Sequence, residues 1–198
     1  MKDFQAFTVK YSGRTNTLFS DVGVSVAFNP EIEISSQTQI HTTKAIWDTG
    51  ATCTVVTKQF AQQINLIPTG RTTITGVNHV TEENTYLVNV YLPNKVCIAF
   101  IKVVEVPALS SNAGMLIGMD IIGAGDFSIY TENDHTVMTY RFPSIGGVDF
   151  VVEAGNIRSN RRISEMLEKQ KSTRKQIVKN KQQRKQERKN RQKGRKNR

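Results

Sequence analysis

The sequence predicts an all-β domain, closed into a barrel or layered as a sandwich, with one or two short helices and a basic C-terminal tail. Short runs rich in Val, Ile, Thr, Phe and Tyr recur over residues 4–143, with turn residues between them. Only two stretches in that range favour a helix. Many short strands with few helices indicate a closed or layered β domain rather than alternating β–α–β units.

The expected strands are bounded by Gly, Pro, Asn or Asp, the residues that favour turns. In chain order they span 4–11, 21–28, 31–36, 38–47, 54–56, a hairpin over 71–93, then 95–106, 115–118 and a final hairpin over 126–143. The turn of the first hairpin is expected near 76–83. The run KVCIAFIKVVEV at 95–106 is apolar enough to predict a long buried strand.

The two helices are expected to be short. In TKQFAQQINL, residues 57–66, the apolar residues Phe60, Ala61 and Ile64 have near-helical spacing, and the pattern stops before Pro68. MDIIGAG, residues 119–125, provides about one turn, which Asp120 is expected to cap.

Charge divides the chain into a body and a tail. Residues 1–157 contain 9 Lys+Arg and 14 Asp+Glu, net −5, whereas residues 158–198 contain 18 and 3, net +15. We therefore expect a domain over 1–157 and a basic tail over 158–198, helical or disordered. The tail could contact the phosphates of a nucleic acid through its charge, or it could simply be solvated. It has no aromatic residue to stack on bases, so sequence-specific recognition is not expected.

Composition also limits the location and the chemistry. The N-terminus lacks the apolar stretch of a signal peptide and no segment is apolar enough to span a bilayer, so we expect a cytoplasmic protein without membrane contact. Cys53 and Cys97 could form one disulfide, but buried free thiols are the expectation. The three histidines lie in separate segments without metal-ligand spacing, which predicts no metal site and no cofactor.

The stretch AIWDTGATCTVV, residues 45–56, contains the candidate for chemistry. Asp and Gly are disfavoured inside strands, so Asp48 is expected where a strand ends. It is then either part of an ordinary β-turn or a carboxylate presented on a rigid loop. A second motif, MLIGMDII, places Gly118 70 residues after Asp48, with the strand-rich hairpin between them.

These two motifs and their order resemble the retropepsin-like aspartic proteases, especially the bacterial members, over residues 39–143. The resemblance implies an acid-protease barrel in which Asp48 is catalytic. It further implies that the Thr49 hydroxyls brace two copies, that Gly50 lets backbone approach the substrate and that Ala51 fills the space beside the carboxylates. Three residues, Leu116, Ile117 and Gly118, would pack against the loop. Gly76 and Val77 would belong to a flap over a peptide or protein substrate.

Peptide hydrolysis by such a site needs two carboxyl groups that share a proton. This chain has one Asp-Thr-Gly, because neither Asp120 nor Asp126 is followed by Thr/Ser-Gly. The second aspartate must then come from a second copy, which predicts a homodimeric aspartic endopeptidase. The alternative is a non-catalytic dimerisation module that presents a basic tail to a nucleic acid.

Overall fold

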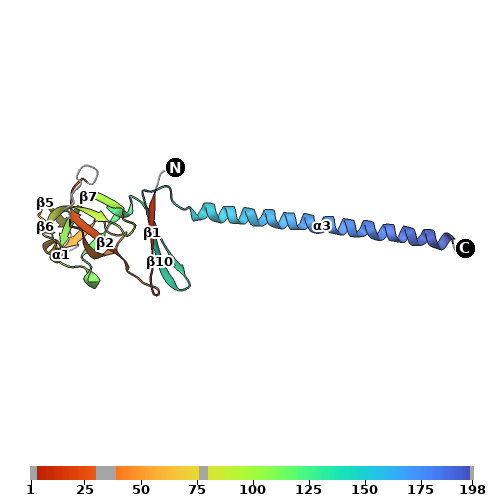
Figure 1. Ribbon diagram of the computed structural model, residues 1–198, viewed down its shortest axis with the longest axis horizontal. Helices are drawn as coiled ribbons and strands as arrows, with labels where there is room; N and C mark the ends of the chain where they lie inside the picture. The colour runs from red at the N-terminus through yellow and green to blue at the C-terminus, as the bar shows by residue number, and fades with distance from the viewer. Residues whose placement is uncertain (1–3, 30–38, 76–79, 197–198) are drawn as a thin grey trace. The chain divides into compact units, whose positions relative to one another are not determined.

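The structure, a computed structural model, describes residues 4–29, 39–75 and 80–196 (Figure 1). The chain divides into two compact units, residues 1–147 and 148–198. The charge pattern placed this boundary at 157/158. The second unit begins earlier because its helix starts at Phe150, in a stretch without basic residues ahead of the first basic residue of the tail, Arg158.

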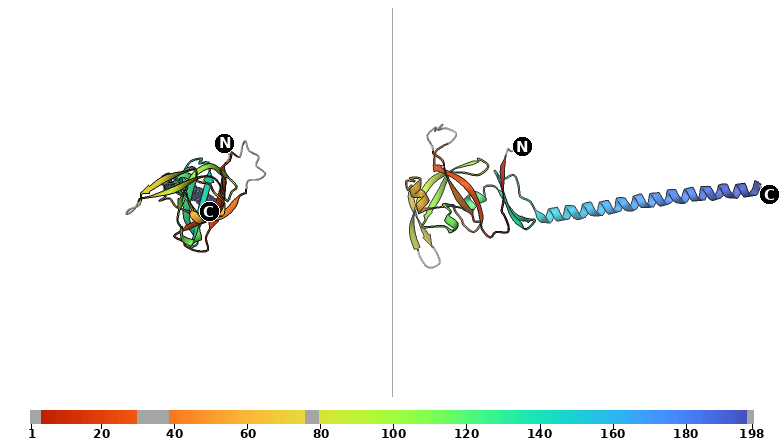
Figure 2. Two further views of the ribbon diagram at one scale, coloured as in Figure 1. Left: turned by 90° about the vertical axis from the view of Figure 1, so that its left-hand side faces the viewer. Right: turned by 60° about the horizontal axis from the view of Figure 1, so that its bottom comes forward.

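Six strands of the first unit close into a barrel in the order β2-β3-β8-β4-β7-β6, with β6 pairing back to β2 (Figure 2). They are β2 (Leu18–Val26), β3 (His41–Trp47), β4 (Val55–Thr57), β6 (Val80–Tyr91), β7 (Cys97–Val106) and β8 (Met115–Ile117). A seventh strand, β5 (Gly70–Thr75), pairs with β6 as the first predicted hairpin. The prediction of an all-β fold with a closed barrel is confirmed.

Two pairs of neighbouring barrel strands run parallel. β3 pairs with β8, Trp47 opposite Ile117, and β4 pairs with β7, Val55 opposite Val104. The residues that follow β3 and β8 therefore meet at the same end of the barrel, although they are far apart in the chain.

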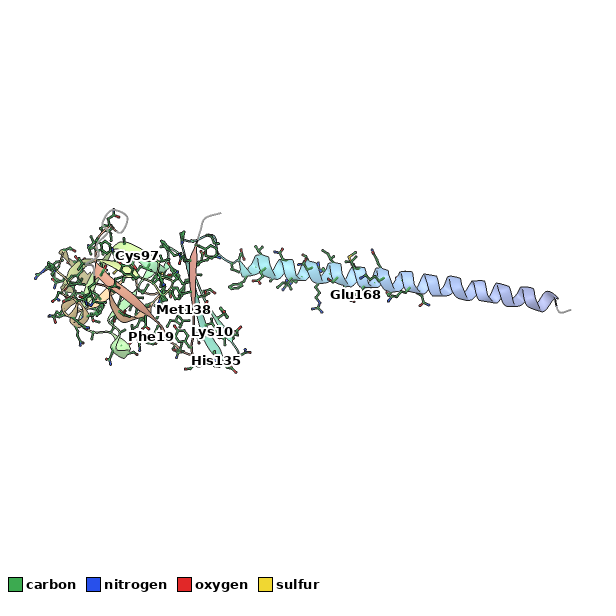
Figure 3. The ribbon with its side chains drawn as sticks, in the orientation of Figure 1. Lys10, Phe19, Cys97, His135, Met138 and Glu168 are labelled. Carbon is green, nitrogen blue, oxygen red and sulfur yellow. The ribbon has the colours of Figure 1, made fainter. Side chains whose placement is uncertain are left out.

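A second, three-stranded antiparallel sheet has the order β1-β10-β9. Its strands are β1 (Gln5–Lys10), β9 (Asp126–Glu132) and β10 (His135–Phe142), and Figure 3 labels Lys10, His135 and Met138 on it. One face of this sheet packs on the barrel, because Met138 and Tyr140 are fully buried in the same core cluster as Trp47. The two sheets thus share one hydrophobic core.

The two helices of the first unit are short, as predicted. α1 (Lys58–Gln63) is capped by Thr57, whose Oγ1 accepts from the Phe60 N–H at 3.2 Å, and it buries Phe60 and Ala61. α2 (Met119–Ile122) forms a single turn. A 3₁₀ turn, η1 (Ser110–Asn112), precedes β8.

The strand predicted at 95–106 is shorter and less buried than expected. It begins at Cys97, because Lys95 adopts a positive φ of 66° in the preceding turn. Phe100, with φ 57°, is 49% exposed, and its N–H donates to the Asn89 side chain beside a register shift in β6. This irregularity turns Phe100 away from the core, while Ile98 and Ile101 still pack against it. The strand expected at 31–36 lies outside the described residues.

The second unit is a single helix, α3 (Phe150–Lys196). Asp149 caps it, since Asp149 Oδ1 accepts from the Val151 and Val152 N–H groups at 2.8 and 3.2 Å. Its described apolar side chains, including Ile163, Met166 and Leu167, are more than half exposed. No helix in the described part of the chain combines the length and hydrophobicity needed to cross a membrane.

Candidate active site

Asp48 follows directly after the last residue of β3 and is held by the strand beside it. Its N–H donates to the Ile117 carbonyl oxygen at 3.0 Å, which continues the parallel β3–β8 ladder by one bond. The structure therefore brings the Asp-Thr-Gly loop next to Leu116, Ile117 and Gly118, across 70 residues of chain. Ile117, which accepts this hydrogen bond, is fully buried.

The loop itself is a tight turn built around the Asp48 side chain. Asp48 Oδ1 accepts from the Gly50 N–H at 2.8 Å, and the Ala51 N–H donates to the Asp48 carbonyl oxygen at 3.2 Å. This local bonding is the kind that favours Asp in turns. Asp48 and Ala51 are half-buried, whereas Thr49 and Gly50 are exposed. One carboxylate is thus fixed at its base and open to solvent.

The segment after β8 locks the far side of the loop. The Met119 N–H donates to the Ala51 carbonyl oxygen at 2.8 Å. A Cβ at Gly118 would lie 2.5 Å from both the carbonyl carbon and the oxygen of Cys53, closer than real Cβ contacts. Only glycine lets these two segments approach so closely.

Thr54 and Asp120 form a polar bridge behind the loop. Thr54 is fully buried, and its N–H and hydroxyl donate to the two Asp120 carboxylate oxygens at 2.9 and 2.7 Å. The Thr54 hydroxyl in turn accepts from the Gly118 N–H at 3.1 Å. Asp120 was expected to cap the short helix, but the N-cap position belongs to Gly118. Asp120 instead ties the strand after the loop to the segment after β8.

Trp47 anchors the residue before Asp48. It is 4% exposed and stacks on Phe127 of β9, with ring centroids 5.7 Å apart and planes 6° apart. Phe7 and Tyr140 pack against it at 5.8 and 5.1 Å, and its Nε1 donates to Ser20 Oγ at 2.8 Å. Trp47 is a core residue.

The described residues add neither a nucleophile nor a metal site beside Asp48. Burial, and after it the Asp120 carboxylate, raise the pKa of the Cys53 thiol, which disfavours the nucleophilic thiolate. Cys53 and Cys97 are both free. Within the described ranges, no three His, Cys, Asp or Glu side chains gather as metal ligands. Gly76, Val77 and His79 lie outside the described residues.

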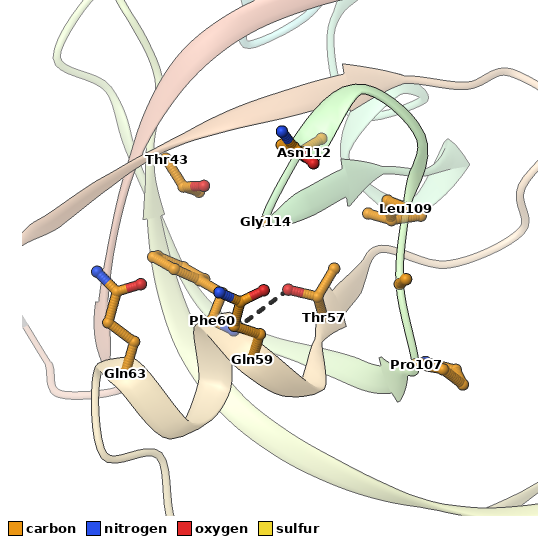
Figure 4. Close-up of a pocket in the computed structure, with 11 residues that line it drawn as sticks. Thr43, Thr57, Gln59, Phe60, Gln63, Pro107, Leu109, Asn112 and Gly114 are labelled. Atoms are coloured by element: carbon orange, nitrogen blue, oxygen red, sulfur yellow. Dashed lines mark hydrogen bonds between the residues drawn. The ribbon is translucent and has the colours of Figure 1, made fainter.

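A pocket of about 440 Å³ lies elsewhere on the barrel (Figure 4). Thr43 of β3, Gln59, Phe60 and Gln63 of α1, and Gly114 just before β8 line part of it. Thr43 lies near the beginning of β3 and Gly114 just before β8, whereas Asp48 and Gly118 follow the ends of the same strands. The pocket is therefore separate from the Asp48 loop.

Comparisons with known proteins match the barrel to a family model and to solved structures. Residues 34–124, a little under half of the chain, match the family described as "gag-polyprotein putative aspartyl protease". The crystal structure of a retropepsin-like aspartic protease from Rickettsia conorii is similar, with a TM-score of 0.44 and 14% sequence identity over 71% of this chain and 97% of that chain. No curated protein matches the chain.

Proposed function

We propose that this chain is a homodimeric endopeptidase with one Asp48 carboxylate from each copy, which the match of residues 34–124 to the family of gag-polyprotein putative aspartyl proteases supports. The observation that carries this proposal is the fixed geometry of the loop. At its start the Asp48 N–H is hydrogen-bonded to the Ile117 carbonyl, and at its end the Ala51 carbonyl accepts from the Met119 N–H. The Asp48 carboxylate remains accessible.

One copy supplies half of the required chemistry. The acid nearest the second motif, Asp120, accepts three hydrogen bonds, two from Thr54 and one from the Ile121 N–H, and is thereby committed to the scaffold. A two-fold axis beside Asp48 would bring a second Asp48 within about 3 Å, the separation at which two carboxyls share one proton. The pair then titrates as a unit.

The reaction follows from that shared proton. The ionised carboxylate removes a proton from water as the water oxygen attacks the scissile carbonyl carbon, and the protonated carboxyl donates its proton to the carbonyl oxygen. The tetrahedral intermediate collapses when the peptide C–N bond breaks. The leaving nitrogen takes the proton that the first carboxyl received from water, and a hydroxyl of the intermediate returns a proton to the second carboxylate, which restores the shared proton. The Gly50 N–H holds Asp48 Oδ1 in place, and the exposed Thr49 would brace the partner's loop.

The test is cleavage of a peptide library by the full chain and by Asp48→Asn. Asn keeps the shape of the side chain but cannot ionise, so we expect turnover to fall by roughly three orders of magnitude or more with the fold unchanged. Asp21→Asn, at an exposed position of β2, is the matched control and should cleave as the wild type does. Undiminished cleavage by Asp48→Asn would refute the mechanism.

A second candidate function concerns the basic helix. Residues 158–198 carry a net charge of +15, and the described side chains of 158–173 are exposed along α3. This observation favours contact with a polyanion such as RNA through charge. In this candidate the barrel only dimerises the tails, Asp48→Asn is silent, and the tail is essential.

A further inference from the structure

The pocket shown in Figure 4 is a cleft between α1 and the segment 107–114, which joins β7 to β8. Its volume, about 440 Å³, is in the range of cavities that hold ligands in proteins. Thr43 of β3 and Thr57, just ahead of α1, also contribute to its wall. Residues from separate parts of the barrel therefore converge on one cleft, and the chemistry proposed for Asp48 uses none of them.

The lining of the cleft is polar at its rim and carries no charge. Gln59, Gln63 and Asn112 are exposed, whereas Phe60 and Gly114 are buried. Among the described residues that line the cleft, none has a charged side chain. A carboxamide both donates and accepts hydrogen bonds. Such a lining suits a neutral ligand that also does both, because a charged ligand would lose its hydration without gaining an opposite charge.

β3 has an unpaired edge at the same place. It pairs with β2 from His41 to Trp47, but with β8 only from Ala45 onward. β8 does not extend further back along β3, because Ser111 and Asn112 adopt positive φ values of 60° and 55°, which do not fit a strand. The first residues of β3 therefore lack a neighbour on that side over the described part of the chain.

The main-chain groups of Thr42 face this open edge. The Gly114 N–H donates to the Lys44 carbonyl oxygen at 3.1 Å, so the main-chain groups of Lys44 point to the side of β8. Backbone groups alternate between the two sides of a strand, and those of Thr42, two residues earlier, point the same way. Thr43, next to Thr42, lines the cleft. The edge is thus available to a segment that lies in the cleft.

The open edge and the carboxamide lining favour the same kind of ligand. An extended peptide adds to a free strand edge through main-chain hydrogen bonds, and its remaining peptide groups donate and accept as carboxamides do. A ligand that binds by stacking, such as a nucleobase, is less suited. Phe60, the aromatic residue of the lining, is 5% exposed and offers no open ring face.

We propose that this cleft binds an extended, uncharged polypeptide segment along the β3 edge at Thr42. The inference goes beyond the proposed function, because the cleft is remote from the candidate catalytic loop. Thr43 and Asp48 are five residues apart along extended chain, about 17 Å at roughly 3.3 Å per residue. A segment held in the cleft is therefore bound and not cleaved.

Binding of uncharged peptides tests the proposal. The full chain with Asp48→Asn is incubated with acetylated, amidated octapeptides randomised over Ala, Val, Ser, Thr, Asn and Gln, and the retained peptide is identified by mass spectrometry. Its Kd is then measured by fluorescence anisotropy. We expect Gln63→Ala to raise that Kd about three- to tenfold, the effect of one lost hydrogen bond.

The matched control is Gln62→Ala, which removes an exposed glutamine of the same helix from outside the lining and should leave the Kd unchanged. Retention of no peptide, or equal weakening by Gln62→Ala and Gln63→Ala, overturns the proposal. A second variant, Ala108→Trp, fills the cleft from an exposed position and should abolish binding. Unchanged binding by Ala108→Trp also overturns it.

Hydrogen exchange locates the bound peptide on the chain. An added strand supplies an acceptor for the Thr42 N–H, so exchange of that amide should slow by roughly tenfold or more on binding. The Thr49 N–H, in the exposed part of the Asp48 loop, should exchange as before. Slowing at Thr49 instead of Thr42 would place the peptide at the candidate active site and contradict the proposal.

The outcomes separate this inference from the proposed function, because the binding measurements use a chain in which Asp48 cannot ionise. Peptide binding in the cleft without any cleavage by the wild type leaves the cleft as a binding site and removes the peptidase. Cleavage by the wild type, together with no peptide retained in the cleft, does the reverse.

Discussion

A few polar groups hold the candidate catalytic loop, and Thr54 is central among them. Its hydroxyl donates to Asp120 and accepts from the Gly118 N–H, in a place with no access to water. Both partners would be left without that bond if the hydroxyl were removed. A buried polar group without a partner destabilises the fold more than a lost surface hydrogen bond does.

We therefore predict that Thr54→Val, which keeps the shape but not the hydroxyl, lowers the free energy of unfolding by about 1–3 kcal/mol. Thr54→Ser restores the hydroxyl and should recover most of that loss. Urea denaturation of the two variants measures the difference. Equal stability of the Val and Ser variants would show that the bridge does not hold the loop.

Residue-level prediction from sequence succeeded where local chemistry is distinctive. Asp48 was recognisable because an aspartate and a glycine interrupt an apolar strand, and Gly118 because it ends a second apolar run. Thr54 was not, because a threonine in a β-branched run is ordinary for a strand. Its role depends on Asp120, 66 residues away in the chain, and no local pattern encodes that contact.

At the scale of elements, β9 is fastened to the chain that follows β10 by one carboxylate. Asp126 accepts from Ser144 Oγ at 2.6 Å, from Arg141 Nε at 2.5 Å and from the Ile145 N–H at 3.1 Å. The Ser144 and Arg141 hydrogen bonds, followed by that of Ile145, lower the pKa of Asp126 to about 2, from an ordinary value of 3.8. The ionised carboxylate is thus favoured by folding.

This predicts a pH-dependent contribution to stability. A carboxyl whose pKa is lowered by folding stabilises the protein above its unfolded pKa, and the contribution is lost as pH falls through the folded value. Asp126→Asn should therefore lower Tm at pH 7, and the difference from wild type should disappear between about pH 4 and pH 2. Asp134→Asn, which removes an ion pair with Arg14 at an 86% exposed side chain, should change Tm little. A difference that persists unchanged at pH 2 would contradict this assignment.

Most elements could be predicted because hydrophobic pattern and turn residues agree. The two hairpins, both short helices and the strand before Asp48 follow from such patterns. The exceptions have specific causes. Asn89 and Phe100 create an irregularity in β6–β7 through a long-range hydrogen bond. The start of α3 differs from the predicted start of the tail because the tail was delimited by its basic residues, whereas Asp149 caps the helix ahead of the first of them.

At the scale of the whole molecule, closure of the barrel brings together segments that lie far apart in the sequence. The β2–β6 pairing closes the barrel, and the parallel β3–β8 pair places both motifs at one end of it. The alternation of a single strand does not say which strand it will pair with, so the strand pattern alone allowed a closed barrel or a sandwich, and the resemblance to aspartic proteases favoured the barrel. The second copy is likewise not encoded in any local pattern.

The separation of charge along the chain predicts how the basic helix behaves. If residues 158–198 bind RNA through charge, a plot of the logarithm of affinity against that of salt concentration should be linear and steep. Fluorescence anisotropy with a short unstructured RNA, between 50 and 200 mM salt, measures that slope. A chain ending at Gly147 is the control and should show no binding. Salt-independent binding, or binding by the shortened chain, would exclude this role for the tail.

The most direct test of a carboxylate pair shared by two copies is the activity of mixed dimers. Wild-type and Asp48→Asn chains are combined in equal amounts, diluted until dimers dissociate, and reconcentrated before a peptide-cleavage assay. Random pairing leaves about one quarter of the dimers with two Asp48 carboxylates, so activity should be about one quarter of that of an all-wild-type sample at the same total concentration. Activity of about one half, proportional to the wild-type chain present, would mean that each Asp48 acts alone and would contradict the shared pair.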